Sequence, residues 1–308
     1  MIHTIAALVA RIFANPAANV LQKQLTARGA SATAVNLATY TLLAAACLIP
    51  AAGVDWGAFA PAFWWDCVAV GLLGGVGNMF LVKALERGEL SVLGPVNSWK
   101  SVVGMVVGAM VLGEIPGVWG LAGMALIVGG SYLVLTVPGE RLSWGLFACR
   151  DIRWRLWAMV LTAVEAVFIK RIIVASSPLT SFIVWCWFGA AASALVVLFS
   201  RHNHSLRRLR IDGIHALSPA TPGFWRTMRT RGGWLRCVGV AVCVGVAQYC
   251  TNVVFRGMDV GYALALFQLS AVVSVLLGWR IFRERGIARK LLGAAVMIAG
   301  SVLVILLD

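Results

Sequence analysis

The chain has 308 residues, of which 60% are hydrophobic and only 12% are charged, and it carries a formal net charge of +14. A soluble domain of this length could not bury so much apolar surface, because soluble chains contain about 25% charged residues. The composition therefore excludes a soluble enzyme or binding domain and predicts an all-α integral membrane protein.

Ten apolar runs approach or reach the length that crosses a bilayer, which is about 20 residues. The first run, residues 5–21, is interrupted by Arg11 and Pro16, and no small-residue cleavage site follows it. We therefore expect a retained helix there rather than a secretory signal. Five runs fall in each half of the chain; the others are residues 32–52, 63–82, 91–112, 119–137, 156–174, 179–199, 235–254, 260–281 and 291–307.

From Asn78 onward the chain repeats itself at a fixed offset of 170 residues, so that Gly123 aligns with Gly293 and Gly130 with Gly300. A duplicated unit with an odd number of spans enters the membrane upside down in its second copy, as in many secondary transporters. We predict ten transmembrane helices as two inverted five-helix repeats. The first repeat covers residues 1–137, a linker covers 138–155, and the second repeat covers 156–308 with a basic loop insertion at 200–234.

The positive charges are concentrated in alternate loops. The odd-numbered loops and their flanks hold 21 of the 26 lysines and arginines, and the even-numbered loops hold three. By the positive-inside rule, the odd-numbered loops lie in the cytoplasm and both termini lie outside. The basicity then reflects topology, and we expect no nucleic-acid partner. The insertion at 200–234 is either a solvated cytoplasmic loop or an interfacial segment attracted to anionic lipid.

Polar side chains within the predicted spans are the candidates for a functional site, because lipid cannot hydrogen-bond them. In the first run Arg11, Asn15 and Asn19 recur every four residues and form one polar stripe. This stripe lines a substrate site or makes interhelical hydrogen bonds. In the fourth run a Gly-Pro break precedes Asn97, Trp99 and Lys100. Interrupted helices of this kind line transporter sites.

Glu165 is the only acidic residue deep within a predicted span. A buried carboxylate can carry a coupling proton, and the alternative is a static ion pair with Lys100 or Arg11. The remaining candidates are amides, each of which either lines the cavity or makes a hydrogen bond within the bundle: Asn78 in the third run, Gln248 and Asn252 in the eighth, and Gln268 in the ninth.

Other residue patterns indicate packing rather than chemistry. Most tryptophans mark helix ends, but Trp99, Trp185 and Trp187 fall well inside their runs. Gly71 with Gly75, and Gly104 with Gly108, have the spacing that lets two helices pack closely. The chain has no nucleotide-binding loop, no HExxH or G-x-S-x-G motif and no His/Cys cluster with metal spacing. We therefore expect no enzymatic activity, no cofactor and no metal.

Several weak motifs in this order and spacing resemble the EamA-type ten-helix branch of the drug/metabolite transporter (DMT) superfamily. The resemblance implies a bacterial inner-membrane carrier, often an exporter of amino acids or other metabolites, driven by a proton gradient or by exchange. The long basic loop between the seventh and eighth helices departs from the pattern. The motifs are the polar first helix with Asn19 and Lys23, the stretch from Ala84 through Pro95 to Gly113 and Glu114, the helix with Gly123, Gly129, Gly130 and Ser131, and the repeat from Gly261 through Glu284 to Gly300.

We expect alternating-access transport of a small polar metabolite through a cavity lined by helices 1, 3, 4, 6, 8 and 9. An anionic or zwitterionic solute would lie against Lys100 or Arg11. One alternative is a flippase or transporter of a lipid-linked or sugar-phosphate headgroup, and another, from a different class, is a non-transporting membrane scaffold or complex subunit. The expected partners are the bilayer and a small-molecule substrate, and the expected state is a monomer or homodimer.

Overall fold

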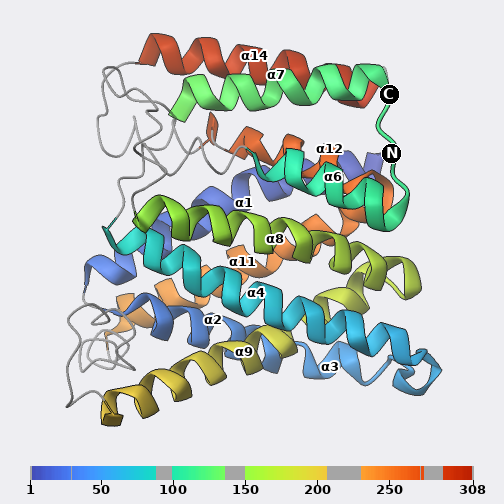
Figure 1. Ribbon diagram of the computed structural model, residues 1–308. Coiled ribbons are helices and arrows are strands. Elements are labelled where there is room, and N and C mark those ends of the chain that lie inside the picture. Colours follow the sequence, from blue (N-terminus) through green and yellow to red (C-terminus); the bar gives the residue numbers. More distant parts are fainter. Residues whose placement is uncertain are drawn as a thin grey trace.

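The computed structural model describes residues 2–28, 30–87, 99–135, 150–206, 230–270, 272–273 and 287–306. These residues form helices joined by turns, without strands (Figure 1). This is the all-α membrane architecture that the composition predicts. The elements of the first half are α1 (Ile2–Ala27), α2 (Ala32–Ala46), α3 (Leu48–Ala51), η1 (Trp56–Ala58), α4 (Pro61–Arg87), α6 (Lys100–Leu112) and α7 (Val118–Leu135). Those of the second half are α8 (Arg150–Ala175), α9 (Pro178–Leu206), α11 (Arg231–Gly257), α12 (Val260–Leu266), η4 (Phe267–Leu269) and α14 (Ile287–Leu306).

Each of the ten apolar runs overlaps one of these helices. Three described stretches are long and apolar enough to cross a membrane by length and composition alone: Ile2–Gln22, Pro178–Leu198 and Gly232–Gly257. The other apolar helices are shorter, and α6 and α12 are only the described parts of the runs at 91–112 and 260–281. Large apolar side chains such as Leu72 and Met110 face outward, as helices surrounded by lipid require.

Local sequence explains where several helices begin and end. The Ser31 hydroxyl accepts a hydrogen bond from the backbone N–H of Ala34 and caps α2, and Thr230 caps α11 in the same way. Pro61 and Pro178 occupy the first helical position of α4 and α9, where a missing N–H costs nothing. Gly113 ends α6 with a φ of 71°, a left-handed conformation that favours glycine.

Two predicted boundaries shift in the structure. The helix α8 begins at Arg150, inside the predicted linker at 138–155, and α9 continues to Leu206, inside the predicted insertion at 200–234. The rest of the linker before Arg150, and residues 207–229 of the insertion, lie outside the described residues. Both helices extend beyond their apolar runs, because the polar residues that flank a run can remain helical outside the bilayer.

The helices associate in pairs that join the two halves of the chain. The pairs are α1 with α11, α4 with α8, α2 with α9, α6 with α12 and α7 with α14. If the ten spans are numbered in chain order, these pairs are 1–8, 3–6, 2–7, 4–9 and 5–10. Replacing each span by its counterpart in the other half of the chain gives the same five pairs. Figure 1 shows both chain ends at the same end of the bundle, with α1 running away from that end and α8 running back toward it.

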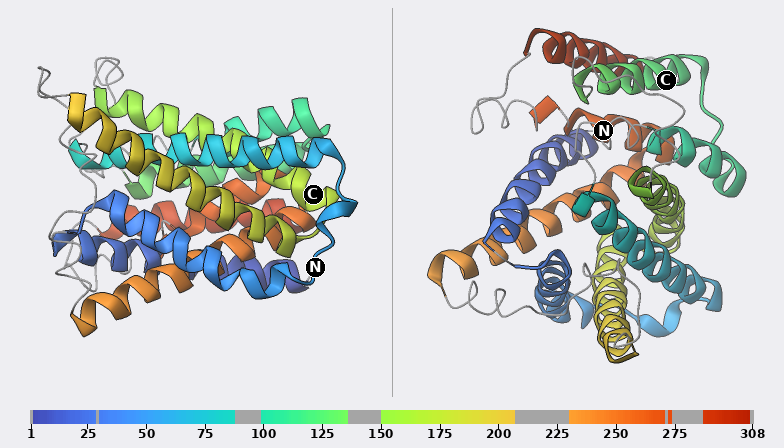
Figure 2. Two further views of the ribbon diagram at one scale, coloured as in Figure 1. Left: turned by 90° about the horizontal axis from the view of Figure 1, so that it is seen from below. Right: turned by 60° about the vertical axis from the view of Figure 1, so that its left-hand side comes forward.

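The contact between α7 and α14 has the symmetry of an inverted duplication. A Cβ at Gly123 would lie 2.6 Å from the carbonyl oxygen of Gly300, and a Cβ at Gly130 would lie 2.7 Å from that of Gly293. The helices are therefore antiparallel. Gly293 and Gly300 are the repeat equivalents of Gly123 and Gly130 at the offset of 170 residues, so the two contacts are equivalent by the repeat. Figure 2 shows this pair at one edge of the bundle. An inverted repeat requires this geometry; the full five-helix repeats stay a prediction.

Candidate functional site

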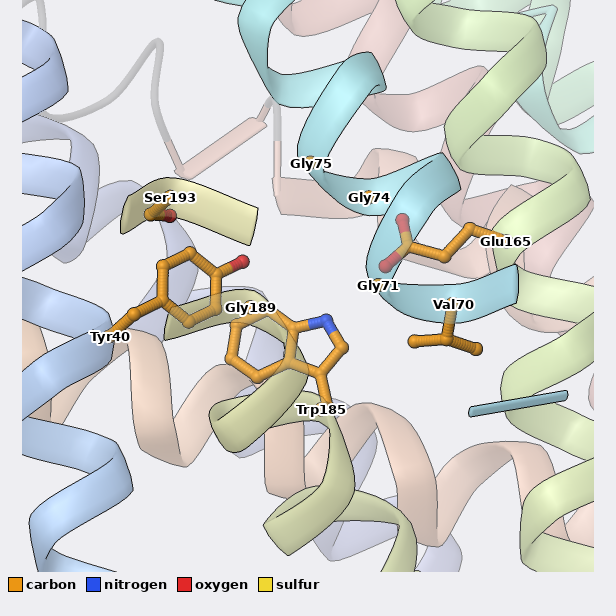
Figure 3. Close-up of a pocket in the computed structure, with 9 residues that line it drawn as sticks. All are labelled: Tyr40, Val70, Gly71, Gly74, Gly75, Glu165, Trp185, Gly189 and Ser193. Atoms are coloured by element: carbon orange, nitrogen blue, oxygen red, sulfur yellow. The ribbon is translucent and has the colours of Figure 1, made fainter. Parts of the chain in front are cut away.

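A pocket lies between α2, α4, α8 and α9, two helices from each half of the chain (Figure 3). Its cavity volume is about 10 Å³, which is room for about one water molecule. Tyr40, Glu165, Trp185 and Ser193 line it with aromatic and polar groups, and the rest of the lining is apolar or bare backbone: Val70, Gly71, Gly74, Gly75 and Gly189.

Glu165 supplies the charge of this pocket. Its side chain extends from α8 toward α4, where Gly74 leaves room for it: a Cβ at Gly74 would lie 2.6 Å from Oε1 of Glu165. The residue is only 8% exposed. A buried carboxylate is costly unless its charge is compensated. Here the indole N–H of Trp185 donates to it, and Lys100 at the start of α6 lies within electrostatic range.

Two aromatic rings form one wall of the pocket. The ring centroids of Tyr40 and Trp185 are 4.7 Å apart, with 47° between the ring planes. The Tyr40 ring lies so close to Gly189 on α9 that a side chain there would collide with it. One turn further along α9, the Ser193 hydroxyl accepts a hydrogen bond of 3.1 Å from the Asn36 amide of α2. The Ser193 proton is therefore free to point elsewhere, and α2 is hydrogen-bonded to α9 across the two halves.

The opposite wall is the backbone of α4. A Cβ at Gly71 would lie 3.0 Å from Cβ of Phe188, and one at Gly75 would lie 2.6 Å from Cβ of Ala192. The small-xxx-small spacing of these glycines predicts such close packing, and the structure shows it between α4 and α9. The glycines of α4 that border the pocket are therefore in close contact with α9 and with Glu165.

Arg11 joins three helices outside this pocket. Its Nε donates to the Thr251 hydroxyl at 3.3 Å, and its Nη1 donates to the carbonyl oxygen of Phe267 at 3.4 Å. The guanidinium carbon lies 3.8 Å from the centre of the Phe267 ring, a cation–π distance. These contacts tie α1 to α11 and to the end of α12. Asn15 is half-buried and Asn19 is exposed on the same helix.

The predicted amides of α11 are engaged with their neighbours. Nε2 of Gln248 donates to Oδ1 of Asn252 at 3.1 Å, and Nδ2 of Asn252 donates to the carbonyl oxygen of Pro178 at 3.1 Å. Asn252 is fully buried, so this short chain of hydrogen bonds fixes α11 against the start of α9. Gln268 is buried in η4.

The remaining predicted residues lie near α6 or on α4. Trp99 precedes α6 and is 57% exposed, and Lys100 is half-buried. Asn97 lies outside the described residues, as does the side chain of Asn78 on α4. Glu165 therefore lines the pocket, whereas none of the described residues predicted to line a cavity does so. This pocket lies between spans 2, 3, 6 and 7; the substrate cavity lined by helices 1, 3, 4, 6, 8 and 9 stays a prediction.

Sequence reasoning did not select Tyr40, Trp185 or Ser193 for the site. Trp185 gave a usable signal, because it lies deep in its run while most tryptophans mark helix ends. Tyr40 and Ser193 gave none, since a single tyrosine is common in a membrane helix and a serine hydroxyl there often bonds to the backbone of its own helix. In the part of the chain that the structure describes, no group of three His, Cys, Asp or Glu side chains could hold a metal ion.

An ion pair joins the two halves away from the pocket. Nζ of Lys170 on α8 lies 2.8 Å from Oε1 of Glu114, just after α6, and donates to the carbonyl oxygen of Met258 at 2.8 Å. The other Glu114 oxygen accepts the backbone N–H of Val260 at 2.9 Å. The pair thus links the end of α6 to α8 and to the turn before α12.

Residues 4–136 match the family model of the EamA-like transporter family. The match places residues 4–136 in the drug/metabolite transporter superfamily. The whole chain also shares its fold with a solved structure titled only "Crystal structure of protein", at a TM-score of 0.74 and 19% identity over 99% of each chain. No curated protein matches the chain in sequence. The resemblance seen in the sequence motifs is thereby confirmed for residues 4–136.

Proposed function

We propose that the protein is a secondary active transporter that exports a small polar metabolite, an amino acid or a related compound, by alternating access. We place it in the inner membrane, with the basic odd-numbered loops in the cytoplasm and both termini outside. The observation that carries the proposal is the pocket between the two halves with Glu165 buried in its wall. Secondary transporters hold their substrates at such a position between repeats.

The depth of the pocket supports this function. Gly74 is the fourteenth of the 27 residues of α4, and Glu165 is the sixteenth of the 26 residues of α8. Ser193 likewise lies near the middle of α9. A helix that crosses a bilayer has its midpoint near mid-membrane, so a solute in this pocket would lie about equally far from both surfaces. A site at that depth serves alternating access, because each side can open to it in turn.

The assembly of the pocket also supports alternating access. It receives α2 and α4 from the first half and α8 and α9 from the second. Rocking one half against the other would therefore change the separation of its walls. The glycine face of α4 suits movement against α9, because α4 has no side chains at these positions that interdigitate with α9.

Glu165 is the proposed carrier of the coupling proton. Its carboxylate lies inside the pocket, where its protonation could depend on whether substrate is present. The competing hypothesis is a static ion pair with Lys100, which lies within electrostatic range. A carrier must change its proton occupancy during each cycle, whereas a static partner need not.

The proposal is tested by comparing metabolites in cells and in spent medium with and without the gene. We expect a small polar compound to accumulate in the medium only when the gene is present. The purified protein in proteoliposomes should then exchange that compound in its labelled form. If a correctly folded protein exchanges none of the compounds identified in this way, the transport function is wrong and the scaffold alternative gains.

A further inference from the structure

Resting on the transport function proposed above, we propose that two ion pairs on α8 form an outer gate, which must break before the bundle opens at the end where the termini lie. The four residues of the outer gate are Asp66, Glu114, Lys170 and Arg171. Three observations carry the inference: both pairs join opposite halves of the chain, both lie at one end of the bundle, and the repeat places a weaker contact at the other end.

Both ion pairs connect α8, in the second half of the chain, to the first half. Nζ of Lys170 lies 2.8 Å from Oε1 of Glu114, which follows α6. Nε of the next residue, Arg171, donates to Oδ2 of Asp66, near the start of α4, at 3.1 Å. If one half rocks against the other, the partners of each pair move apart at this end. Neither pair can therefore persist when the bundle is open there.

The outer gate lies at the end of the bundle that the proposed topology puts outside the cell. There α8 ends and α4 begins (Figure 1). The side chains of Glu114 and Asp66 are only 12% and 10% exposed. Charges that are shielded from water attract each other more strongly than charges on an open surface. The two pairs therefore hold this end closed more firmly than ordinary surface ion pairs would.

Glu114 makes a further contact across the halves. Its Oε2 accepts the backbone N–H of Val260, at the start of α12, at 2.9 Å. Lys170 also donates to the carbonyl oxygen of Met258 at 2.8 Å, within its own half. After separation Lys170 would keep this carbonyl as a partner, whereas Glu114 would lose the ammonium and the N–H together. Closure therefore depends on Glu114 more than on Lys170.

The repeat relates one of the two pairs to a weaker contact at the opposite end of the bundle. At the offset of 170 residues Asp66 corresponds to Arg236, and at the offset of 147 that aligns α1 with α8, Arg171 corresponds to Gln24. Nε of Arg236 donates to Oε1 of Gln24 at 3.0 Å in an exposed hydrogen bond that also joins the two halves. A neutral amide thus stands where the outer gate has a carboxylate. This inequality favours the state that is closed at the outer end.

Two native cysteines can report the two ends separately. Cys67 on α4 follows Asp66 and is fully buried. Its repeat equivalent at the offset of 170, Cys237 on α11, follows Arg236 and is 3% exposed. A maleimide reacts with a thiol only when the thiol becomes accessible. Opening at the outer end should expose Cys67, and opening at the opposite end should expose Cys237.

The rates of maleimide labelling of these cysteines test the outer gate. The full-length protein in lipid nanodiscs, where both faces are accessible, is labelled without substrate, and mass spectrometry follows each cysteine peptide. Glu114→Gln removes the negative charge but keeps an oxygen that can accept from Val260, and it leaves Asp66 beside Cys67 unaltered. We expect labelling of Cys67 to become at least ~3-fold faster and labelling of Cys237 no faster, because the population shifts toward the state open at the outer end.

The matched control is Asp55→Asn. Asp55 is an exposed carboxylate that accepts a hydrogen bond from the N–H of Gly57, and asparagine still caps η1 there; both rates should be unchanged. Unchanged labelling of Cys67 in Glu114→Gln would overturn the gate. Equal acceleration of both cysteines would also overturn it, because it would indicate general loosening of the bundle.

A second variant acts from the opposite end and decides the question if Glu114→Gln does not fold. Gln24→Glu places a carboxylate opposite Arg236 and so strengthens the contact that competes with the outer gate. A surface ion pair is weak, so we expect labelling of Cys67 to become about twofold faster. Cys67 is the reporter here because it lies far from the added charge. Unchanged or slower labelling of Cys67 would contradict the gate.

The outcomes separate this inference from the transport function. Faster labelling of Cys67 in Glu114→Gln, with no exchange of any compound by the unaltered protein in proteoliposomes, would refute transport and keep the gate as a two-state device. Exchange of a metabolite with unchanged labelling of Cys67 would refute the gate and keep transport.

Discussion

The bundle contains two polar regions that are built in opposite ways. Where α1 meets α11 and the end of α12, Arg11 bonds to Thr251 and to the Phe267 carbonyl, and Gln248 bonds to Asn252. In the pocket between α2, α4, α8 and α9, one carboxylate faces two aromatic rings and bare backbone. The first region is rich in polar groups that satisfy one another. The second has few, and they border a cavity of about 10 Å³.

This difference shows how to distinguish structural from functional polarity inside a membrane. Without water, polar groups that cluster on facing helices find partners among themselves, and such bonds contribute about 0.6 kcal/mol on average. A site for a solute must instead keep some hydrogen-bonding capacity unused by the protein. A membrane helix with several polar residues is therefore expected to turn them toward the interior of the bundle. Their presence does not predict that they bind substrate.

The change with the largest expected effect is Glu165→Gln in the pocket. If Glu165 carries the coupling proton, gradient-driven flux in proteoliposomes should be abolished while exchange of substrate persists, because glutamine cannot take up or release a proton. Unchanged uphill transport would exclude Glu165 as the carrier. Asp55→Asn, which removes an exposed carboxylate that does not line the pocket, should leave both activities unchanged.

Arg11→Met tests the polar region that we interpret as structural. Loss of the hydrogen bonds of Arg11 should lower the free energy of unfolding by about 2 kcal/mol, measured by denaturant titration in mild detergent. The rate of transport in proteoliposomes should persist. Arg256→Met, which removes an exposed arginine at the end of α11, is the control. Lost transport at unchanged stability would move the site to α1.

Gly74→Ala sharpens the boundary of the pocket. Its Cβ would press on the Glu165 carboxylate, which can swing away because it ends a flexible side chain. We therefore expect little change in stability and a several-fold decrease in the rate of transport. Gly129→Ala is the matched control, since a Cβ there meets nothing within 4 Å. Equal rates in the two variants would argue against a functional role for the carboxylate position.

Gln248→Ala should have the smallest effect. It removes one hydrogen bond to Asn252, which still donates to the carbonyl of Pro178. We expect a loss of about 0.6 kcal/mol in stability and an unchanged rate of transport, measured on the same preparations. A transport defect at full stability would place Gln248 in the substrate path.

The sequence predicted the helices well, whereas it named one of the residues that line the described pocket. All ten apolar runs overlap helices, and the glycines Gly71 and Gly75 pack as their spacing predicts. At equivalent positions of the repeat, Ser131 and Ser301 each bond to a carbonyl three residues earlier at 2.8 Å. Of the predicted site, Glu165 lines the pocket, whereas Arg11 does not. Periodicity assigns a residue to a face of its own helix but does not specify the partner helix.

The sequence by itself determined the class of this protein, because a chain in lipid must satisfy its backbone within helices, and hydropathy and charge record that requirement residue by residue. Tertiary structure alone decided which polar groups meet. Whether a side chain is a hydrogen-bond partner or a ligand depends on what lies across from it on another helix. Arg11 meets a carbonyl and a ring, and Glu165 meets the Trp185 indole beside a small cavity between the two halves of the bundle.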